Sequence, residues 1–227
     1  MIGAQVLTAQ TMTLAWLFYL PVLGWTIWRC PWVELFTDAR RQHLLFGTVF
    51  ALFLLWLMRR DFDTGVSFHF LGMTAVTLLL DWPLAIVGGF IAQLGLLALG
   101  RQELAPLGVN GLVLIVLPVL ITEGCSLIVE RAQPKSPFTY IFCSGFFAAG
   151  LAALACLLVA MGLLWHDGLF AMPEWLEDFI GYIWLIVFPE AFINGVIITA
   201  LVVFCPEWLE TFNRTRYLSP PSKGNGR

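Results

Sequence analysis

Charged residues are scarce in this 227-residue chain, and their scarcity excludes most classes of soluble protein. Only 12% of the residues are charged and 59% are hydrophobic, whereas soluble domains have roughly 25% charged and about 45–50% apolar residues. The net charge of −3 offers no basic face for nucleic acid. The composition therefore predicts a multi-pass membrane protein that lies in the lipid bilayer and has no nucleic-acid partner.

The chain also lacks the common catalytic and metal-binding motifs. It has no G-x-x-x-x-G-K-[ST] loop, no H-E-x-x-H helix and no G-x-S-x-G turn. Its five cysteines form no C-x-x-C pair, so we expect neither disulfides nor a thiolate metal site. We therefore expect no enzyme and no permanently bound cofactor, and any ATP-driven work must come from another subunit.

Long apolar segments are what the chain does have. A spanning helix needs roughly 20 mainly apolar residues, and seven segments come near that length. They are residues 11–28, 44–58, 65–80, 82–99, 107–129, 138–165 and 179–204. Asp81-Trp82-Pro83 predicts a tight turn between the third and fourth segments. We expect an all-α polytopic membrane helical bundle in one domain, residues 1–218, with a disordered cytoplasmic tail, residues 219–227.

The distribution of Lys and Arg among the loops predicts the orientation of the bundle. Cytoplasmic loops carry the excess of these residues. Seven spans with the N-terminus outside place nine of them inside and three outside. The inside set is Arg29, Arg40, Arg41, Arg131, Lys135, Arg214, Arg216, Lys223 and Arg227, and the outside set is Arg59, Arg60 and Arg101. We expect the N-terminus outside and the C-terminus inside.

A few polar side chains interrupt the apolar segments. Ionisable groups inside a membrane are costly and are functional candidates by default. They are His69, Glu123 and Glu190, with Asn110, Asn194 and Gln93 as uncharged companions. The predicted topology puts His69, Asn110 and Glu190 in the outer half of the bundle. We therefore expect a polar pocket that is open to the outside.

Each of these residues also has a structural interpretation. His69 could simply bond a carbonyl or hydroxyl of a neighbouring helix, and Asn110 could join two helices. Pro189 frees a carbonyl beside Glu190 and could equally well only kink the helix. Glu190 and Asn194 are four residues apart and share a helix face. For Glu123, a structural or partner-facing role is favoured.

Three sequence blocks resemble the CbiM-like family, the membrane substrate-binding permeases of cobalt and nickel energy-coupling-factor transporters. "SFHFLG" (67–72) resembles the family's Ser/Thr-Gly-His-Leu-Leu-Gly, and "PLGVNGLVLIVLP" (106–118) resembles its Leu-Gly-x-Asn block. "FPEAFINGVIITALVV" (188–203) resembles its Pro-x-x-x-Ile-Glu-Gly-x-Ile-Thr segment. The order and spacing agree over about residues 60 to 205, and a divergent proteobacterial branch is closer still.

The resemblance implies a metal site but not its full ligand set. In the family the N-terminus folds back into the outer pocket, where its amine and a following histidine bind the metal with the histidine of the first block. Only His69 carries over, while Asn110 matches an Asn that positions the binding loop and Asn194 stands where the family usually has Glu. Met1 is followed by Ile2, Gly3 and Ala4, so the N-terminal histidine is missing. Glu190 and other groups could replace it, the metal could differ, or the ligand could be no metal.

Together these observations predict a substrate-binding permease subunit of an energy-coupling-factor ABC transporter in the bacterial inner membrane. It would import a divalent transition metal, cobalt or nickel by resemblance and zinc or copper as alternatives. The predicted partners are a transmembrane coupling protein and ATPase subunits. The predicted substrate site is His69, Asn110, Glu190 and Asn194, with His69 and Glu190 as metal ligands. Two other functions stay open: a membrane accessory or assembly protein with a structural polar core, and a proton-linked carrier.

Overall fold

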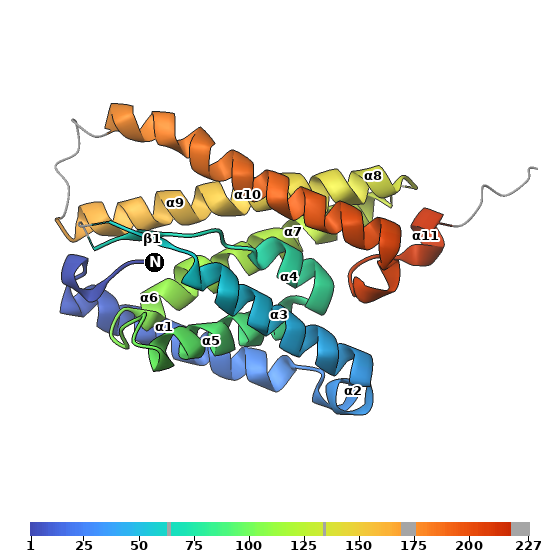
Figure 1. The fold of residues 1–227 in the computed structure, drawn as a ribbon, viewed down its shortest axis with the longest axis horizontal. Coiled ribbons are helices and arrows are strands. Elements are labelled where there is room, and N and C mark those ends of the chain that lie inside the picture. Colours follow the sequence, from blue (N-terminus) through green and yellow to red (C-terminus); the bar gives the residue numbers. More distant parts are fainter. Residues whose placement is uncertain (63–64, 134, 169–175, 219–227) are drawn as a thin grey trace, which may run out of the picture.

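The computed structural model shows a bundle of helices that run roughly along one long axis (Figure 1). It describes residues 1–62, 65–133, 135–168 and 176–218, so the predicted tail lies outside the described residues. The helices are η1 (Ala4–Val6), α1 (Ala9–Arg29), α2 (Trp32–Thr37), α3 (Ala39–Leu57), α4 (Met73–Leu80), α5 (Trp82–Ala98), α6 (Leu107–Gly111), η2 (Leu112–Val116), α7 (Leu117–Ala132), α8 (Pro137–Thr139), η3 (Tyr140–Phe147), α9 (Ala148–His166), α10 (Leu176–Phe204), η4 (Pro206–Trp208) and α11 (Arg214–Leu218).

Six of the seven predicted spans correspond to long helices or continuous helical rods. α6, η2 and α7 form one rod, and α8, η3 and α9 form another; η2 and η3 are π-helical turns. Within the described ranges, four stretches are long and apolar enough to cross a membrane: Ala9–Arg29, Leu107–Ala132, Pro137–His166 and Ile183–Phe204. α9 packs against both α7 and α10, and α3 packs against α5. The prediction of a helical membrane bundle is confirmed.

The third predicted span, residues 65–80, is wrong as a single helix. Only α4, eight residues long, is helical there. Ser67–Phe68 instead forms β2, which pairs antiparallel with β1 (Arg60–Asp61). A short apolar run suits a buried strand as well as a helix, so composition could not separate the two. Gly72, at φ 67°, makes the left-handed turn that starts α4.

The predicted turn between the third and fourth segments is confirmed. Asp81 is the one residue between α4 and α5, and it adopts a positive φ of 76°. Its Oδ1 atom accepts a hydrogen bond of 2.8 Å from the Trp82 amide, and Pro83 lies in the first turn of α5. Because the Asp81 side chain accepts from the Trp82 amide and Pro suits a first helical turn, these residues reverse the chain within one position.

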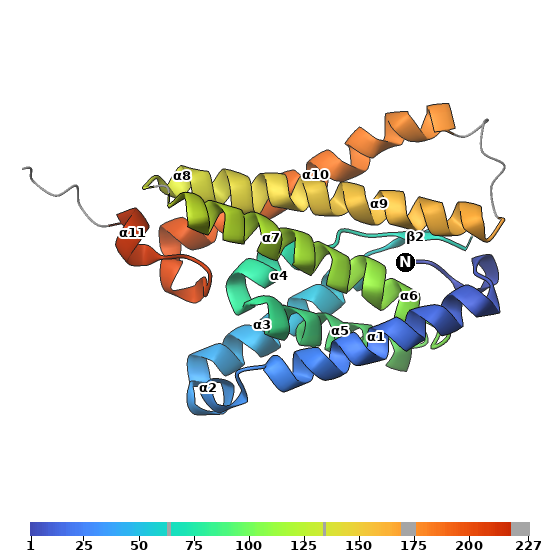
Figure 2. The same ribbon diagram turned by 180° about the vertical axis from the view of Figure 1, so that it is seen from behind.

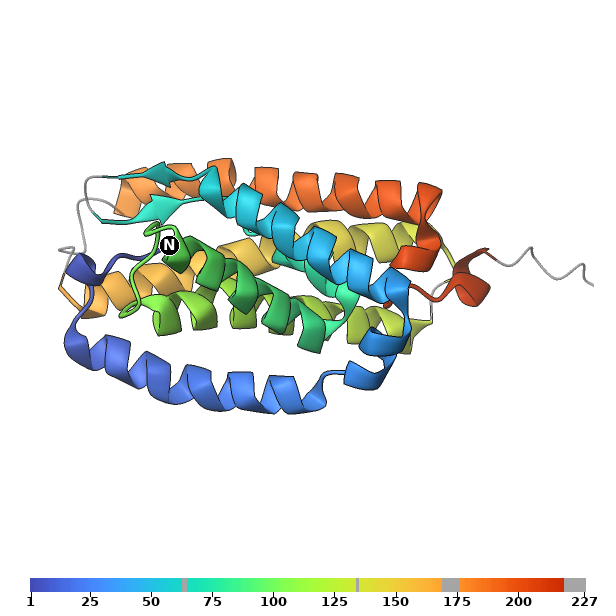
Figure 3. The same ribbon diagram turned by 60° about the horizontal axis from the view of Figure 1, so that its bottom comes forward.

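The N-terminal residues enter the bundle beside β2. Ile2 pairs with Val66 in an antiparallel bridge, and the Gly3 amide donates to the Gly65 carbonyl at 2.9 Å. A Cβ atom on Gly3 would lie 2.8 Å from that carbonyl oxygen, so glycine permits this close approach. Figure 3 shows the N-terminus next to the two short strands rather than at the outside of the bundle.

The two ends of the bundle differ in character. The N-terminus and the two strands lie at one end, while α2 and α11 lie at the other (Figure 2). At this second end Arg41 bonds Glu34 at 2.6 Å and Glu210 at 2.7 Å. The hydrogen bond and charge of Glu210 raise the pKa of Arg41. The five cysteines, all of them described, are free.

Candidate functional site

His69 lies in the non-helical segment between β2 and α4, and its two ring nitrogens have different environments. Nδ1 lies 2.9 Å from the Phe70 carbonyl oxygen. Nε2 is buried and has no hydrogen-bond partner among the described residues. A carbonyl oxygen only accepts hydrogen bonds, so this partner assigns the proton to Nδ1 and leaves a lone pair on Nε2 of the neutral ring. The side chain is only 5% exposed, so this lone pair is shielded from solvent.

Glu190, on α10, holds the backbone that follows His69. Its Oε2 accepts a hydrogen bond from the Leu71 amide, and its Oε1 accepts one from the Gly72 amide, both at 2.8 Å. These amides precede the first turn of α4, where a helix attracts negative charge. Oε1 also accepts a bond of 2.8 Å from Asn194 Nδ2. Three N–H donors therefore engage the Glu190 carboxylate.

Asn194 and Trp56 complete the support of this segment. Asn194 lies one turn after Glu190 on α10, and its Oδ1 accepts a bond of 2.9 Å from the Ala75 amide in the first turn of α4. Trp56, fully buried on α3, donates from its indole to the Leu71 carbonyl at 3.1 Å. Its ring centroid lies 5.6 Å from that of His69. Helices α3 and α10 thus fix the His69 segment from both sides.

Asn110, on α6, fixes the N-terminal strand in the same region. Its Oδ1 accepts a bond of 2.8 Å from the Ile2 amide, and its Nδ2 donates to the Ile2 carbonyl at 2.9 Å. The Met1 amine donates to the Ser67 carbonyl at 2.5 Å, and the Ser67 amide donates back to the Met1 carbonyl at 2.8 Å. These bonds place Met1 beside Ser67 of β2, and Ser67 is two residues before His69 in the chain.

The Met1 amine has an unusual electrostatic environment. Burial, with a smaller contribution from the charge of Arg59, lowers the pKa of this amine from 8.0 to about 5. Arg59 also lies 3.4 Å from the Met1 sulfur and forms an ion pair of 2.8 Å with Asp61. The hydrogen bond from the Ser67 hydroxyl lowers the pKa of Asp61. At neutral pH the Met1 nitrogen is therefore an uncharged amine with a lone pair, and it lies close to the His69 segment.

The four predicted site residues come from three parts of the chain, the His69 segment, α6 and α10, and meet at this end of the bundle. His69 is linked to Glu190 and Asn194 through the backbone of residues 71–75, and Asn110 is linked to it through Ile2 and the strands. Among the described residues, no group of three or more His, Cys, Asp or Glu side chains could hold a metal. The available nitrogen donors are His69 Nε2 and the Met1 amine.

Sequence reasoning did not include Met1 or Trp56 among the site residues. The family resemblance pointed to an N-terminal amine but only His69 was carried over, and one of ten tryptophans has no distinguishing sequence signal. The expected access from the outside is also not visible, because His69 is almost completely buried. The described site is closed over the ring, which is the arrangement expected for a site that excludes water.

The fold and this buried imidazole define a class: a polytopic membrane protein with a cluster of buried polar side chains between its helices. The chain belongs to the CbiM family, the cobalt uptake substrate-specific transmembrane region, whose match covers residues 2–208. It is therefore a membrane component for metal uptake, and this family is one of transporters rather than enzymes.

One solved structure supports the fold. It is described as a truncated transition metal transporter, and it superimposes with a TM-score of 0.64 over 89% of this chain and 98% of its own. The identity is only 15%, so the likeness establishes the arrangement of the helices and not the site. No curated protein matches this chain.

Proposed function

We propose that this chain is the substrate-binding permease subunit of an energy-coupling-factor transporter that imports a divalent transition metal, cobalt or nickel by family. The observation that carries the proposal is the buried, unpartnered Nε2 of His69. Histidines that bind metals usually donate their other ring N–H to a carbonyl or carboxylate. His69 Nδ1 has such a partner in the Phe70 carbonyl, so the ring is already in the tautomer that a metal needs.

The donor chemistry of the site fits a transition metal. Neutral imidazole and amine nitrogens suit cobalt, nickel, copper and zinc, whereas magnesium and calcium prefer oxygen ligands. His69 Nε2 is the first proposed ligand, and the Met1 amine, neutral near pH 7, is the second. In this proposal the Met1 amine stands at the place where the family uses its N-terminal nitrogens, although the second histidine of the family is absent.

For Glu190, two roles are proposed, and they differ in what the carboxylate touches. As a positioning residue, it keeps its three N–H bonds and fixes the His69 segment. As a metal ligand, it would exchange at least one of these bonds for the metal. We favour the positioning role, because losing a buried charged hydrogen bond costs about 1.5–3 kcal/mol. Asn110 and Asn194 act in the same way, on Ile2 and on α4.

The proposed partners follow from the missing nucleotide-binding motif. A transmembrane coupling protein and ATPase subunits would turn the permease over in the bacterial inner membrane, with the N-terminus and the metal site facing outside. Metal uptake by cells should then stop when the ATPase subunits are removed. Uptake that continues without them would favour the proton-linked carrier, and purified protein that binds no metal would favour the accessory protein.

The direct test compares metal binding by purified wild-type protein and His69→Ala, using Co(II), Ni(II), Zn(II) and Cu(II) in turn. We expect the variant to lose at least about 100-fold in affinity, more than is usual for removing a supporting group around a metal. His166→Ala is the control histidine, because its side chain at the end of α9 is 76% exposed and bonds Asp167 rather than either proposed ligand. Equal binding by wild type and His69→Ala would refute the proposed ligand.

A further inference from the structure

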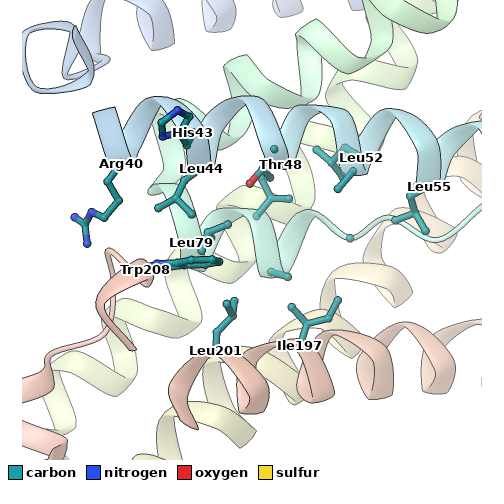
Figure 4. A pocket seen from close by; sticks show the side chains of 15 residues that line it. Arg40, His43, Leu44, Thr48, Leu52, Leu55, Leu79, Ile197, Leu201 and Trp208 are labelled. Atoms are coloured by element: carbon teal, nitrogen blue, oxygen red, sulfur yellow. The ribbon is translucent and has the colours of Figure 1, made fainter. Parts of the chain in front are cut away.

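A long apolar groove runs between α3 and α10, with α4 as its floor (Figure 4). Its volume is about 880 Å³. The wall from α3 includes Leu44, Thr48 and Leu55, and the wall from α10 includes Ile197 and Leu201. The groove is separate from the His69 site, although Gly72, at the start of α4, lies at its far end.

The only ionisable residues among those that line the groove are Arg40 and His43, and both lie at the same end. Trp208 lies at that end too. Arg40 donates to the Glu207 carbonyl and has two loose ion pairs, 3.7 Å to Asp38 and 3.5 Å to Glu210. Its side chain is still 42% exposed, and His43 is also exposed. One end of the groove therefore carries an exposed guanidinium and an exposed imidazole, and its body is apolar.

The length of the groove matches one leaflet of a bilayer. From Arg40 to Leu55, α3 advances 15 residues, which is about 22 Å at 1.5 Å per residue. The hydrocarbon core of a membrane is about 30 Å thick, so the hydrocarbon of one leaflet spans about 15 Å. The headgroup region accounts for the remaining length of about 7 Å. Trp and Arg are typical of the boundary between headgroups and hydrocarbon.

The body of the groove suits hydrocarbon chains. Beyond Arg40 and His43, Thr48 is the one polar aliphatic side chain among the lining residues, and the rest are apolar or glycine apart from the Trp208 indole. An acyl chain that lies there therefore meets mainly apolar surface. Phe46 and Phe50, on the same helix as the α3 wall, are 69% and 62% exposed, so the surroundings of the groove are lipid-facing.

We propose that the groove is a binding site for a membrane phospholipid. The phosphate lies at Arg40 and His43, the glycerol lies beside Trp208, and the acyl chains follow the groove toward Leu55 and Gly72. The chain ends then pack against the first turn of α4. A Cβ atom on Gly72 would already be 3.0 Å from Leu55 Cδ2, so this end is tightly packed. The bound lipid stabilises the base of the segment that carries His69.

The test fills the groove without disturbing the helix. Gly47 lines the groove on α3, and a Cβ atom there would meet nothing within 4 Å. Gly47→Leu therefore places a side chain in the space of the acyl chains. Gly24→Leu is the matched control, because Gly24 is also exposed on a long helix, α1, with nothing within 4 Å, but lies outside the groove. Ala51→Leu, a second variant in the groove, covers the case in which Gly47→Leu does not fold.

Delipidated protein is titrated with phosphatidylglycerol, phosphatidylcholine and phosphate-free diacylglycerol, and bound lipid is counted by native mass spectrometry. We expect one phospholipid per chain in wild type and Gly24→Leu, and at least about tenfold weaker binding in Gly47→Leu or Ala51→Leu, the loss for about two methylene contacts. Diacylglycerol should bind more weakly than both phospholipids. Equal phospholipid binding by the groove variants and the control overturns the proposal.

The occupant in membranes is identified with a photoreactive residue in place of Leu44, which lines the groove. Crosslinks to lipid, and their loss when Gly47→Leu is added, support the proposal. Crosslinks to a second copy of the chain or to another protein, in place of lipid, overturn it.

Discussion

His69 shows how a fold can keep an imidazole nitrogen buried and without a partner among the described residues, as the proposed metal ligand requires. Its Nδ1 is committed to the Phe70 carbonyl, and its Nε2 is left without a partner in a buried place. An unsatisfied buried polar atom costs about 1–3 kcal/mol. Glu190, Asn194 and Trp56 all bond the backbone around it, so the surrounding structure fixes the ring although the ring itself lacks a bond. A metal that binds Nε2 offsets this cost.

Glu190→Gln separates a positioning role from direct metal binding. Glutamine keeps the shape, but its NH₂ group cannot accept from the Leu71 or Gly72 amide. We expect the free energy of unfolding to fall by about 1–3 kcal/mol and metal affinity to fall by about 10–100-fold. Thermal unfolding and metal titration measure the two effects. Glu123→Gln, on a partly exposed position of α7, is the control and should change neither.

A metal ligand at Glu190 would give a different result. Glu190→Gln would then lose as much metal affinity as His69→Ala does. That outcome would contradict the positioning role and return the carboxylate to the ligand set.

The Met1 amine predicts a flat pH dependence near neutrality. Its pKa is about 5, so the amine is already neutral between pH 6 and 8 and does not compete with the metal there. Below pH 5, protonation of this group should weaken metal affinity by about tenfold per pH unit. Metal titrations from pH 4 to 8 check this, on protein whose intact mass confirms Met1 as the first residue.

An ordinary amine would behave differently in the same titration. With a pKa near 8.0, affinity would already fall by about tenfold per unit between pH 8 and 6. Such a profile would contradict a role for a buried, neutral Met1 nitrogen. A variant with extra residues before Met1 is the control and should lose the contribution of the amine.

The sequence revealed the polar side chains of the site but not their backbone partners. His69, Asn110, Glu190 and Asn194 are conspicuous because hydrocarbon gives such groups nothing to bond. Asn110, Glu190 and Asn194 bond main-chain groups, and no side-chain pattern in the sequence indicates these partners. The partners are the backbone groups of residues 2, 71, 72 and 75. The sequence also predicted a pocket open to the outside, whereas His69 is almost completely buried. Spacing along helices does not predict how the non-helical segment that carries His69 packs between them.

At the scale of elements, α4 is the unusual part of the fold. It has eight residues and begins after a strand, so the third segment crosses only part of the bundle as a helix. Non-helical backbone inside a membrane is tolerated where protein groups satisfy it. Here Glu190, Asn194 and Trp56 supply those groups from α10 and α3. The long helices were predictable from length and apolarity, whereas this break depends on contacts between distant residues.

The contact of α1 with α6 depends on a glycine. A Cβ atom on Gly111 would lie 2.2 Å from Tyr19 Cζ, and Tyr19 is fully buried. Gly111→Ala should therefore lower the free energy of unfolding by about 1–3 kcal/mol, although alanine favours helices by about 1 kcal/mol over glycine. Gly124→Ala is the control, because its Cβ would meet nothing within 4 Å. Denaturation in detergent measures both, and equal stability of the two variants would contradict this packing.

At the scale of the whole molecule, the two ends of the bundle differ in their polar contacts. The end with the N-terminus carries the proposed His69 site, and the opposite end carries the ion pairs of Arg41. Membership of the CbiM family agrees with a membrane component for metal uptake. The proposed lipid groove runs along α3 from Arg40 to Leu55 and reaches Gly72, at the start of α4 beside the proposed metal site.

A crystal structure of Co(II)-loaded protein, with anomalous diffraction at the cobalt edge, tests the central proposal most directly. We predict an anomalous peak at bonding distance, about 2.0–2.2 Å, from His69 Nε2, and no such peak in His69→Ala. A cobalt peak elsewhere in the bundle, with His69 Nε2 still unliganded, would contradict the account.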